Sequence, residues 1–420
     1  MMDIVEMAKG AYEASFEIAD LITRNKNDLL LKLADELLAF KEEIFAANNE
    51  DVLAAKENNL PKALVDRLKF NDSRFLEMVD GVKKVAALPD PVGEIYEGRT
   101  VESTLTLYKK RVPLGVVGVI YEARPNVTVD IASLCLKSGN ACVLRGGKEA
   151  LKTNLVLVRI LHKVLKEYQI DPRAVTFIDS PDRELIKTML SLDSYIDVII
   201  PRGGEALHRM CVRFATMPVI VGGFGVSHIF VDKTANLIKA VNIIINSKVQ
   251  KPSACNALDT LLLHEDIAVP LIDMLLPELE KYQIEIYAHG DIFTLCKAKE
   301  YPYLHRGDPT LFDTEWLSLA LNIAAVEDVK DAVAHLRRHK AHHSDSILTD
   351  SCKNAEIFCN GAGSACVYVN ASTRFTDGGQ FGMGAEVAIS TQKLHVRGPM
   401  GLKDLTTYKY ICKGDYLCRK

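Results

Sequence analysis

The sequence predicts an α/β protein in which short apolar strands alternate with helices in doubly wound parallel sheets. From Val112 onward, short apolar strands are separated by helical segments, and a second alternation runs from Val219 to about Val369. Strands that alternate with helices in this way are typical of parallel sheets. A chain of 420 residues that is 48% hydrophobic also has enough apolar surface for two or three domains.

The first 70 residues are predicted to be helical. Apolar residues at 30–44 follow the i, i+3, i+4 spacing, and Asn27 and Asp28 are expected to cap this helix. The Pro-Asp-Pro cluster at 89–91 ends the helical pattern. An alternating, β-branched run that includes Val101, 104–108 and Arg111 predicts a strand.

The first alternation is predicted to contain strands at residues 115–120, 140–145, 175–178 and 196–200. Helices are predicted between them, for instance at 154–168 and 184–190. The second alternation is predicted to contain strands near 228–231, 260–263, 284–287 and 366–369. The tail at 408–419 alternates around an expected turn at 413–415. Ligands of such sheets bind at the carboxyl ends of the strands.

Composition excludes several classes of function. The 51 Lys and Arg against 55 Asp and Glu give a net charge of −4, and without a basic cluster we expect no nucleic-acid partner. Apolar runs such as 112–121 fall short of the roughly 20 residues of a bilayer span, so we expect no membrane partner. The amino terminus shows no secretory signal. Ten cysteines without a C-x-x-C pair predict a cytoplasmic protein with reduced thiols.

Cys255 is a candidate nucleophile, because it follows a Pro-containing loop and precedes an apolar strand. The cationic side chains of Lys248 and Lys251 are expected to favour its thiolate. A buried structural cysteine is the alternative, and it is our interpretation of the other nine cysteines.

Two glycine turns are candidates for binding the phosphates of a nucleotide. Each follows a predicted strand and carries basic side chains; their residues are Arg145, Gly146, Gly147 and Lys148, and Arg202, Gly203 and Gly204. Backbone amides without neighbouring Cβ atoms suit a pyrophosphate, especially at a helix start. Neither turn matches G-x-G-x-x-G or the P-loop, so two ordinary tight turns remain the alternative.

The polar, glycine-rich segment 370–382 is long for a loop within a compact domain, which is typical of functional or disordered loops. The planar guanidinium of Arg374 suits a carboxylate.

Four histidines, His335, His339, His342 and His343, lack an H-E-x-x-H arrangement, so we predict no metal site there. We interpret them as part of a solvated helix face, with His342 and His343 as candidates to lie near a site.

Five motifs of the chain resemble the γ-glutamyl phosphate reductases, also called glutamate-5-semialdehyde dehydrogenases, a branch of the aldehyde dehydrogenase superfamily. They lie at 121–130 (YEARPNVTVD), 137–140 (KSGN), 144–150 (LRGGKEA), 201–204 (PRGG) and 367–382 (VYVNASTRFTDGGQFG). The resemblance covers essentially the whole chain. It implies that the protein reduces L-glutamyl 5-phosphate with NADPH to L-glutamate 5-semialdehyde and phosphate, the second step of proline biosynthesis from glutamate.

The resemblance also implies roles for single residues. Cys255 would displace phosphate to form a thioester, which hydride from the nicotinamide then reduces through a thiohemiacetal. Glu315 matches the glutamate that holds the nicotinamide ribose. Gly222 stands where hydrolytic relatives carry a water-activating glutamate, in the Glu-Leu-Gly-Gly-Lys motif that matches 221–226, and this favours phosphate as the acyl partner. Lys148 stands where NAD-preferring relatives carry a glutamate, so NADP(H) is the expected cofactor.

Two further sets of contacts are expected around the thioester. Ala123 falls near the place of the superfamily's oxyanion asparagine, so the Cys255 amide and the nearby Asn126 are the candidate donors to the oxyanion. Arg124 and Arg374 are expected to bind the α-carboxylate of the substrate.

The implied fold is aldehyde-dehydrogenase-like. Residues 1–220 would form a Rossmann-type cofactor domain, and 221–384 an α/β domain with the catalytic cysteine. Residues 385–420 would return to the cofactor domain and end in an oligomerisation strand, which forms a small β flap with 100–112. A homodimer or homotetramer is expected, and glutamate 5-kinase is a candidate partner.

Two other readings stay open. A hydrolytic aldehyde dehydrogenase is the first, and Gly222 argues against it. A non-catalytic scaffold that kept the fold is the second, and the intact Cys255, Glu315 and glycine turns argue against that.

Overall fold

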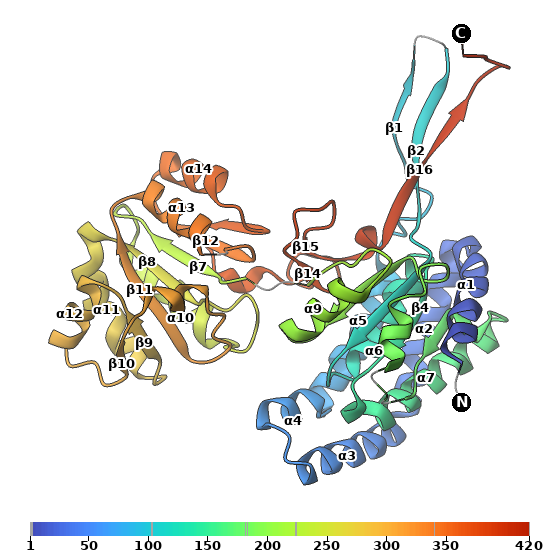
Figure 1. The fold of residues 1–420 in the computed structure, drawn as a ribbon, viewed down its shortest axis with the longest axis horizontal. Helices are drawn as coiled ribbons and strands as arrows, with labels where there is room; N and C mark the ends of the chain where they lie inside the picture. The colour runs from blue at the N-terminus through green and yellow to red at the C-terminus, as the bar shows by residue number, and fades with distance from the viewer. Residues whose placement is uncertain are drawn as a thin grey trace. The chain divides into compact units, whose positions relative to one another are not determined.

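The computed structural model describes residues 3–419, apart from 102, 103, 181, 183, 223, 224 and 340. The chain forms two compact units, each with its own parallel sheet (Figure 1). The first comprises Met1–Gly222, Gly382–Ala388 and Met400–Lys420, and the second Gly223–Phe381 and Ile389–Pro399. The α/β class is therefore confirmed. Residues 389–399, which the sequence analysis placed in the first unit, belong to the second.

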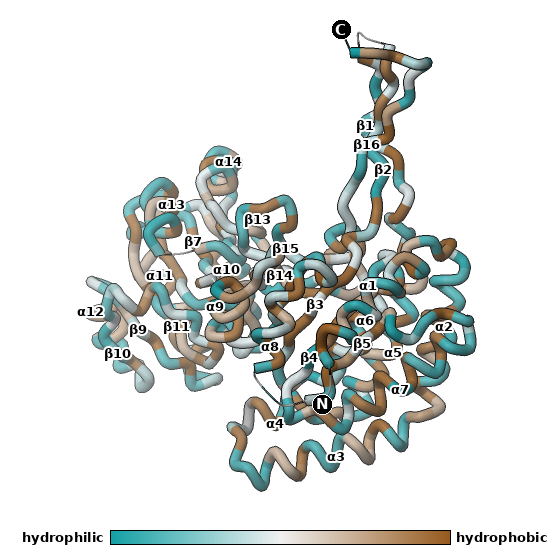
Figure 2. The backbone as a smooth tube through the Cα atoms, turned by 45° about the vertical axis from the view of Figure 1, so that its right-hand side comes forward, coloured by the Kyte–Doolittle hydropathy of each residue, from teal (hydrophilic) through white to brown (hydrophobic). Residues whose placement is uncertain are grey.

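A four-stranded parallel sheet in the order β5-β4-β3-β6 is the centre of the first unit. Its strands are β3 (Val116–Tyr121), β4 (Ala141–Arg145), β5 (Val175–Phe177) and β6 (Val198–Arg202). Nearly every residue in them is buried, and β3 and β4 colour as hydrophobic segments in Figure 2. Burial on both faces is what makes the strands of a parallel sheet read as continuous apolar runs, so all four could be predicted.

The helices of the first unit are α1 (Ile4–Asp20), α2 (Thr23–Ala39), α3 (Lys41–Glu57), α4 (Lys62–Leu68), α5 (Asp72–Ala87), α6 (Asn126–Lys137), α7 (Leu151–Glu167), α8 (Glu184–Met189) and α9 (Glu205–Phe214). The predicted cap at Asn27 and Asp28 is wrong, because both residues lie inside α2. The helix begins earlier because its first turn contacts Asp90: the carboxylate accepts from the Thr23 hydroxyl and from the buried Lys26 ammonium, each at 3.0 Å.

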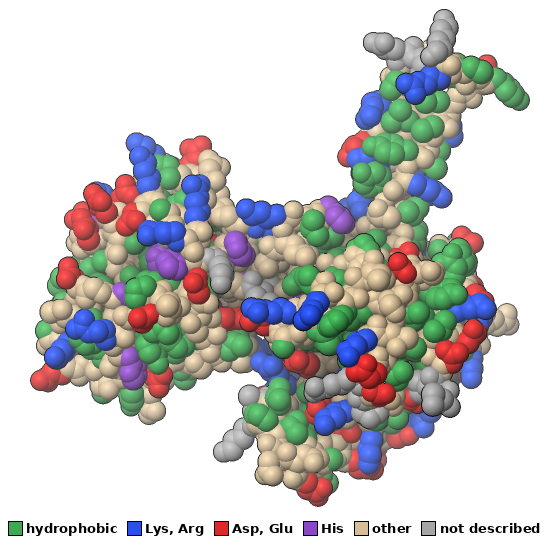
Figure 3. All heavy atoms as spheres, viewed as in Figure 1, with side chains coloured by type: hydrophobic (Ala, Val, Ile, Leu, Met, Phe, Trp, Pro, Cys, Tyr) green, Lys and Arg blue, Asp and Glu red, His purple; other side chains and the backbone are tan. Residues whose placement is uncertain are grey.

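A three-stranded antiparallel arm extends from the first unit (Figure 1). It consists of β1 (Ile95–Thr100), β2 (Thr106–Pro113) and β16 (Thr406–Lys413), in the order β1-β2-β16. The predicted strand at 101–111 begins later than expected, with 102 and 103 outside the described residues. The tail forms its strand before the turn, while 414–419 are irregular. Figure 3 shows hydrophobic side chains beside Lys and Arg along this arm.

The second unit contains a seven-stranded parallel sheet in the order β10-β9-β11-β8-β7-β12-β13. Its strands are β7 (His228–Val231), β8 (Thr260–His264), β9 (Glu285–Ala288), β10 (Leu304–Arg306), β11 (Ala320–Val326), β12 (Ser344–Leu348) and β13 (Cys366–Val369). The predicted strands correspond to β7, β8, β9 and β13, whereas β10, β11 and β12 were missed. A short antiparallel pair, β14 (Ile389–Ser390) and β15 (Gly398–Pro399), completes the unit.

The helices of the second unit are α10 (Leu237–Val249), α11 (Ala268–Glu280), α12 (Asp291–Ala298), α13 (Val329–Arg338) and α14 (Cys352–Gly361). One apolar core packs α10 and α11 against the sheet, and another packs α13 and α14. Among the described residues, no helix combines the length and the apolar character that crossing a membrane requires.

Candidate active site

Cys255 lies in the turn between α10 and β8, at the amino end of the β8 strand. Its side chain is half-buried, and its carbonyl accepts from the Ser227 hydroxyl at 3.4 Å. Two tight backbone bonds, Ala254 N to Lys251 O at 3.1 Å and Ala257 N to Ala254 O at 3.0 Å, fold the turn around it. The thiol therefore sits on a short, internally bonded turn.

Lys248 was expected to favour the Cys255 thiolate, but in the structure its side chain has a different partner. The Lys248 side chain is fully buried, and its ammonium donates to the Leu258 carbonyl at 2.8 Å. Burial lowers the pKa of Lys248 to about 8, and the charge of Asp259 opposes that shift. The ammonium thus stabilises the start of β8, while Lys251 is exposed.

Arg374 is a cation whose charge interacts with that of Cys255. Burial lowers the pKa of the Arg374 guanidinium, and the charges of Cys255 and Asp377 oppose this effect. The half-buried side chain donates from Nε to Gln250 Oε1 at 3.0 Å. The segment 370–376 that carries it is ordered: it includes the 3-10 turn Thr373–Phe375 and runs back along β12 to the Cys255 turn. Disorder is therefore wrong for this part of the predicted loop.

Glu315 lies just before β11, again at the amino edge of the second sheet, and is half-buried. The next residue, Trp316, donates its backbone N–H to Asp259 Oδ1 at 3.0 Å, and its indole stacks on Tyr287 with ring centres 4.4 Å apart. The buried Asp259 also accepts from the Ser227 N–H at 3.2 Å. Burial raises the pKa of Asp259, and Lys248 opposes that rise.

Asp259 was missed by the sequence analysis, although a carboxylate at the start of an apolar strand was a usable signal. Through it, the Glu315 turn is tied to the strand that follows Cys255. The structure therefore brings Cys255, Glu315 and Arg374 to the amino edge of one sheet.

The two glycine turns follow β4 and β6 at the carboxyl edge of the first sheet, as predicted. A Cβ on Gly146 would lie 2.4 Å from Asn154 Nδ2, and one on Gly147 would lie 2.6 Å from the Glu149 carboxylate. Only glycine fits this first turn without a shift of its neighbours. Arg145 is buried beside it, whereas Lys148 is exposed.

The second glycine turn is occupied by a carboxylate that the sequence analysis did not single out. Glu122, directly after β3, accepts the Gly204 N–H at 3.2 Å, where α9 begins. A Cβ on Gly203 would lie only 2.6 Å from the Glu122 carboxyl carbon. A phosphate at the start of α9 would therefore compete with Glu122, so this turn is less suited to a pyrophosphate than predicted. Arg202, at the end of β6, is half-buried.

Asn126 is the first residue of α6, near the same edge. Its Nδ2 donates to Asp130 Oδ2 at 2.9 Å, which leaves one amide hydrogen for another acceptor. Burial raises the pKa of Asp130 to about 6, and the hydrogen bond from Asn126 and the charge of Arg202 oppose that rise. Arg124, between β3 and α6, is exposed.

Gly222 lies close to the buried His208: a Cβ on this glycine would lie 3.1 Å from His208 Cε1. Gly223 and Phe224 of the same motif lie outside the described residues.

The interpretation of the histidines as a solvated face is wrong for His335 and His343. The His335 ring is buried against Phe312, with ring centres 4.6 Å apart, and burial strongly lowers its pKa. His343 is buried with Nδ1 2.8 Å from Ser344 Oγ, while His342 is exposed. Among the described residues, no three His, Cys, Asp or Glu side chains are arranged to hold a metal ion.

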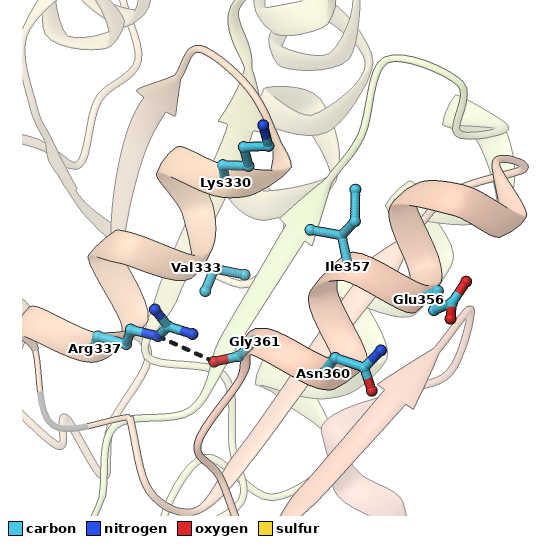
Figure 4. Close-up of a pocket in the computed structure, with 7 residues that line it drawn as sticks. All are labelled: Lys330, Val333, Arg337, Glu356, Ile357, Asn360 and Gly361. Carbon is cyan, nitrogen blue, oxygen red and sulfur yellow. Dashed lines mark hydrogen bonds between the residues drawn. The ribbon is translucent and has the colours of Figure 1, made fainter.

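A groove between α13 and α14 has a volume of about 510 Å³ (Figure 4). Its lining residues are Lys330, Val333, Arg337, Glu356, Ile357, Asn360 and Gly361. Arg337 crosses one end and donates from Nε to the Gly361 carbonyl at 3.3 Å. None of the predicted site residues lines this groove.

Comparison with known proteins gives consistent matches. The profile of the Aldehyde dehydrogenase family matches residues 1–291. The chain is 52% identical to a γ-glutamyl phosphate reductase of Tolumonas auensis and 51% identical to one of Photobacterium profundum, in both cases over 100% of each chain. It is also similar to the crystal structure of γ-glutamyl phosphate reductase from Thermotoga maritima, with a TM-score of 0.94, 43% identity and 100% coverage of both chains.

The raised pKa of Asp130 predicts a pH-dependent gain in stability from Asp130→Asn. Folding partly buries a carboxylate that is ionised above about pH 6 but titrates near 4 when unfolded, so the loss of stability grows from pH 4 to 6 and is complete above it. The amide keeps the bond from Asn126 and removes this cost, so the variant should gain up to about 3 kcal/mol at pH 7.5 and much less at pH 4.5. Urea unfolding at both values measures it, and an equal gain at the two values would contradict the assignment.

Proposed function

Because the chain belongs to the γ-glutamyl phosphate reductases of the aldehyde dehydrogenase family, we propose that it reduces L-glutamyl 5-phosphate with NADPH. The products are L-glutamate 5-semialdehyde and phosphate, which makes the reaction the second step of proline biosynthesis from glutamate. One observation carries the chemistry: the half-buried thiol of Cys255 lies within the electrostatic reach of a guanidinium, that of Arg374.

Cys255 is the proposed nucleophile. A cation near a thiol favours the thiolate, the reactive form. The thiolate attacks the C5 carbonyl carbon, the bond from C5 to the bridging oxygen breaks, and phosphate leaves with that electron pair. Reduction of the resulting thioester gives a thiohemiacetal, which loses its hydroxyl proton and expels the thiolate to release the aldehyde.

The oxygen of C5 gains negative charge as the thiolate adds. The backbone N–H of Cys255 and the remaining amide hydrogen of Asn126 are its proposed donors. Asp130 orients the Asn126 amide through the bond at 2.9 Å, so the donor needs no reorientation when the charge appears. Arg374 and Arg124 are the proposed partners of the α-carboxylate. Nε of Arg374 donates to Gln250, and its terminal nitrogens are the proposed donors to a bidentate anion.

The family uses a nicotinamide cofactor, and we propose NADP(H), which supplies or accepts the hydride. The first glycine turn is its proposed site, because the exposed Lys148 ammonium stands beside it, although the Glu149 carboxylate also lies close to Gly147. Such an ammonium suits a 2′-phosphate, which a carboxylate would repel. Arg145, Gly146, Gly147 and Lys148 are the proposed contacts. Glu315 is proposed for the nicotinamide ribose, and the turn at Arg202, Gly203 and Gly204 is a weaker candidate, since Glu122 already accepts its amide.

Phosphate, rather than water, is the proposed acyl partner. Gly222 has no side chain to activate water, and a larger residue there would press against His208. A thioester that must await hydride is better protected when position 222 supplies no general base.

We also propose that the arm makes contacts between copies of the chain. In the described structure, β1 and β16 are the outer strands of the arm, and each has one edge without a neighbouring strand. The exposed side chains of Tyr408 and Tyr410 lie on β16. Glutamate 5-kinase stays a predicted partner.

The phosphate dependence of the reverse reaction tests the proposed function. With L-glutamate 5-semialdehyde and NADP⁺, formation of reduced nicotinamide should require added phosphate, because only phosphate resolves the thioester. Cys255→Ala should lower this rate at least a thousandfold, since no thioester can form. Absorbance of the reduced nicotinamide measures both. Turnover at the same rate in phosphate-free buffer would show that water is the acyl partner and would overturn the proposal.

Lys148→Glu should shift the cofactor preference from NADP⁺ toward NAD⁺. The substitution replaces a cation near the 2′-phosphate by an anion, and the loss of one charged contact plus the new repulsion should lower the ratio of kcat/KM for NADP⁺ to that for NAD⁺ about a hundredfold. Lys152→Glu, an exposed lysine paired with Glu50 on the neighbouring helix, is the matched control and should leave the ratio unchanged. An unchanged ratio in Lys148→Glu would remove the lysine from the cofactor site.

A further inference from the structure

We propose that Thr373 is a positioning residue for the nucleophile: together with Thr376 it clamps Asn256, the residue that follows Cys255, and so holds the thiol beside Arg374. The inference rests on the proposed function, in which Cys255 is the nucleophile. It adds two residues that are not among the proposed contacts of the substrate or the cofactor.

The clamp consists of two hydrogen bonds, one to the backbone and one from the side chain of Asn256. The Thr373 hydroxyl donates to the Asn256 carbonyl at 2.7 Å, and Asn256 Nδ2 donates to the Thr376 carbonyl at 2.7 Å. Both threonines are fully buried and Asn256 is 3% exposed, so no water replaces these bonds without a rearrangement. Rotation of Asn256, and with it of the Cys255 peptide, would break at least one of them.

The clamp is itself anchored in the core of the second unit. The Thr376 hydroxyl lies 2.6 Å from Ser344 Oγ at the start of β12 and 2.7 Å from the Tyr368 hydroxyl on β13. The neighbouring Ser372 hydroxyl lies 2.8 Å from Ser247 Oγ on α10. The segment is thus hydrogen-bonded to two strands and a helix. These bonds fix the position of the groups that hold Asn256.

The same short segment carries the cation. Arg374 lies directly after Thr373, and its Nε donates to Gln250, which begins the turn that holds Cys255. The electrostatic interaction between Arg374 and Cys255 therefore depends on how 372–376 sits against 250–256. The clamp joins these two stretches at the residue next to the nucleophile, so it helps to set the distance between the thiol and the guanidinium.

The test compares Thr373→Val with Thr373→Ser and with the matched control Thr349→Val. Valine keeps the shape of threonine and removes the hydroxyl, while serine keeps the hydroxyl. Thr349 lies directly after β12 in the same unit, is 3% exposed, and its hydroxyl donates to Asp232 at 2.7 Å. The readouts are kcat of the phosphate-dependent reverse reaction, KM for NADP⁺, the midpoint of thermal unfolding, and the pH profile of Cys255 alkylation by iodoacetamide, followed by peptide mass spectrometry.

Thr373→Val should lower kcat about ten- to a hundredfold, because a small displacement of a reacting group is that costly. Its profile of Cys255 alkylation should shift to higher pH, because the displaced thiol loses the cation that favours its thiolate. KM for NADP⁺ should stay within about twofold, as a displaced thiol does not change cofactor contacts. Thr373→Ser should retain kcat within about threefold. Thr349→Val should lower the midpoint of thermal unfolding about as much as Thr373→Val does, and it should keep the wild-type kcat. If Thr373→Val does not fold, Thr376→Val, which loses the anchoring bonds, carries the same expectation.

Wild-type kcat and alkylation in Thr373→Val, or an equal loss of kcat in Thr349→Val, would overturn the clamp. A wild-type enzyme without phosphate-dependent turnover would instead overturn the proposed function. The alkylation profile would still decide whether Thr373 positions the thiol, since alkylation needs neither substrate nor cofactor.

Discussion

Polar groups buried behind Cys255 must be hydrogen-bonded within the protein, and this constraint shapes the amino edge of the second sheet. Asp259 accepts backbone N–H groups from Ser227 and from Trp316, and Asn256 is bonded to two threonines. A buried polar group left without a partner costs roughly 1–3 kcal/mol, so each of these bonds resists displacement. The strand after Cys255, the turn of Glu315 and the segment of Arg374 are consequently fixed to one another.

In the first unit, the carboxyl edge of the sheet carries side chains of both positive and negative charge. Lys148 is exposed after β4, whereas Glu122 accepts the N–H of Gly204, the N-cap of α9. A nucleotide that carries several phosphates gains from the lysine and is repelled by the glutamate. The turn after β4 is the better candidate for the phosphates, because Glu122 accepts an amide of the second turn, although the Glu149 carboxylate also lies close to Gly147.

Local patterns predicted the elements that are buried on both faces and apolar. β3 and β8 read as strands because all of their residues are buried and most of them are apolar. β12 was missed because it begins Ser-Asp-Ser, although all five of its residues are buried. Its Asp345 accepts from both the N–H and Nδ1 of His228, 117 positions away in the sequence, so the partner that makes burial possible is invisible to a local pattern.

The same distinction applies to the site. Cys255, Arg374 and the glycine turns stand in motifs that could be recognised from neighbouring residues. Lys248 was misassigned, and Asp259, Glu122 and Thr373 were missed, because their partners lie on other elements. A buried lysine and an exposed one look identical in a sequence until the fold decides which carbonyl or carboxylate each of them meets.

The central claim is that Cys255 carries the acyl group and that phosphate, not water, removes it. The most direct measurement is the mass of the acid-quenched enzyme after mixing with L-glutamate 5-semialdehyde and NADP⁺ in phosphate-free buffer. The account predicts a glutamyl adduct on the peptide that contains Cys255, which persists until phosphate is added and then disappears. An adduct on another cysteine, or one that decays equally fast without phosphate, would contradict it.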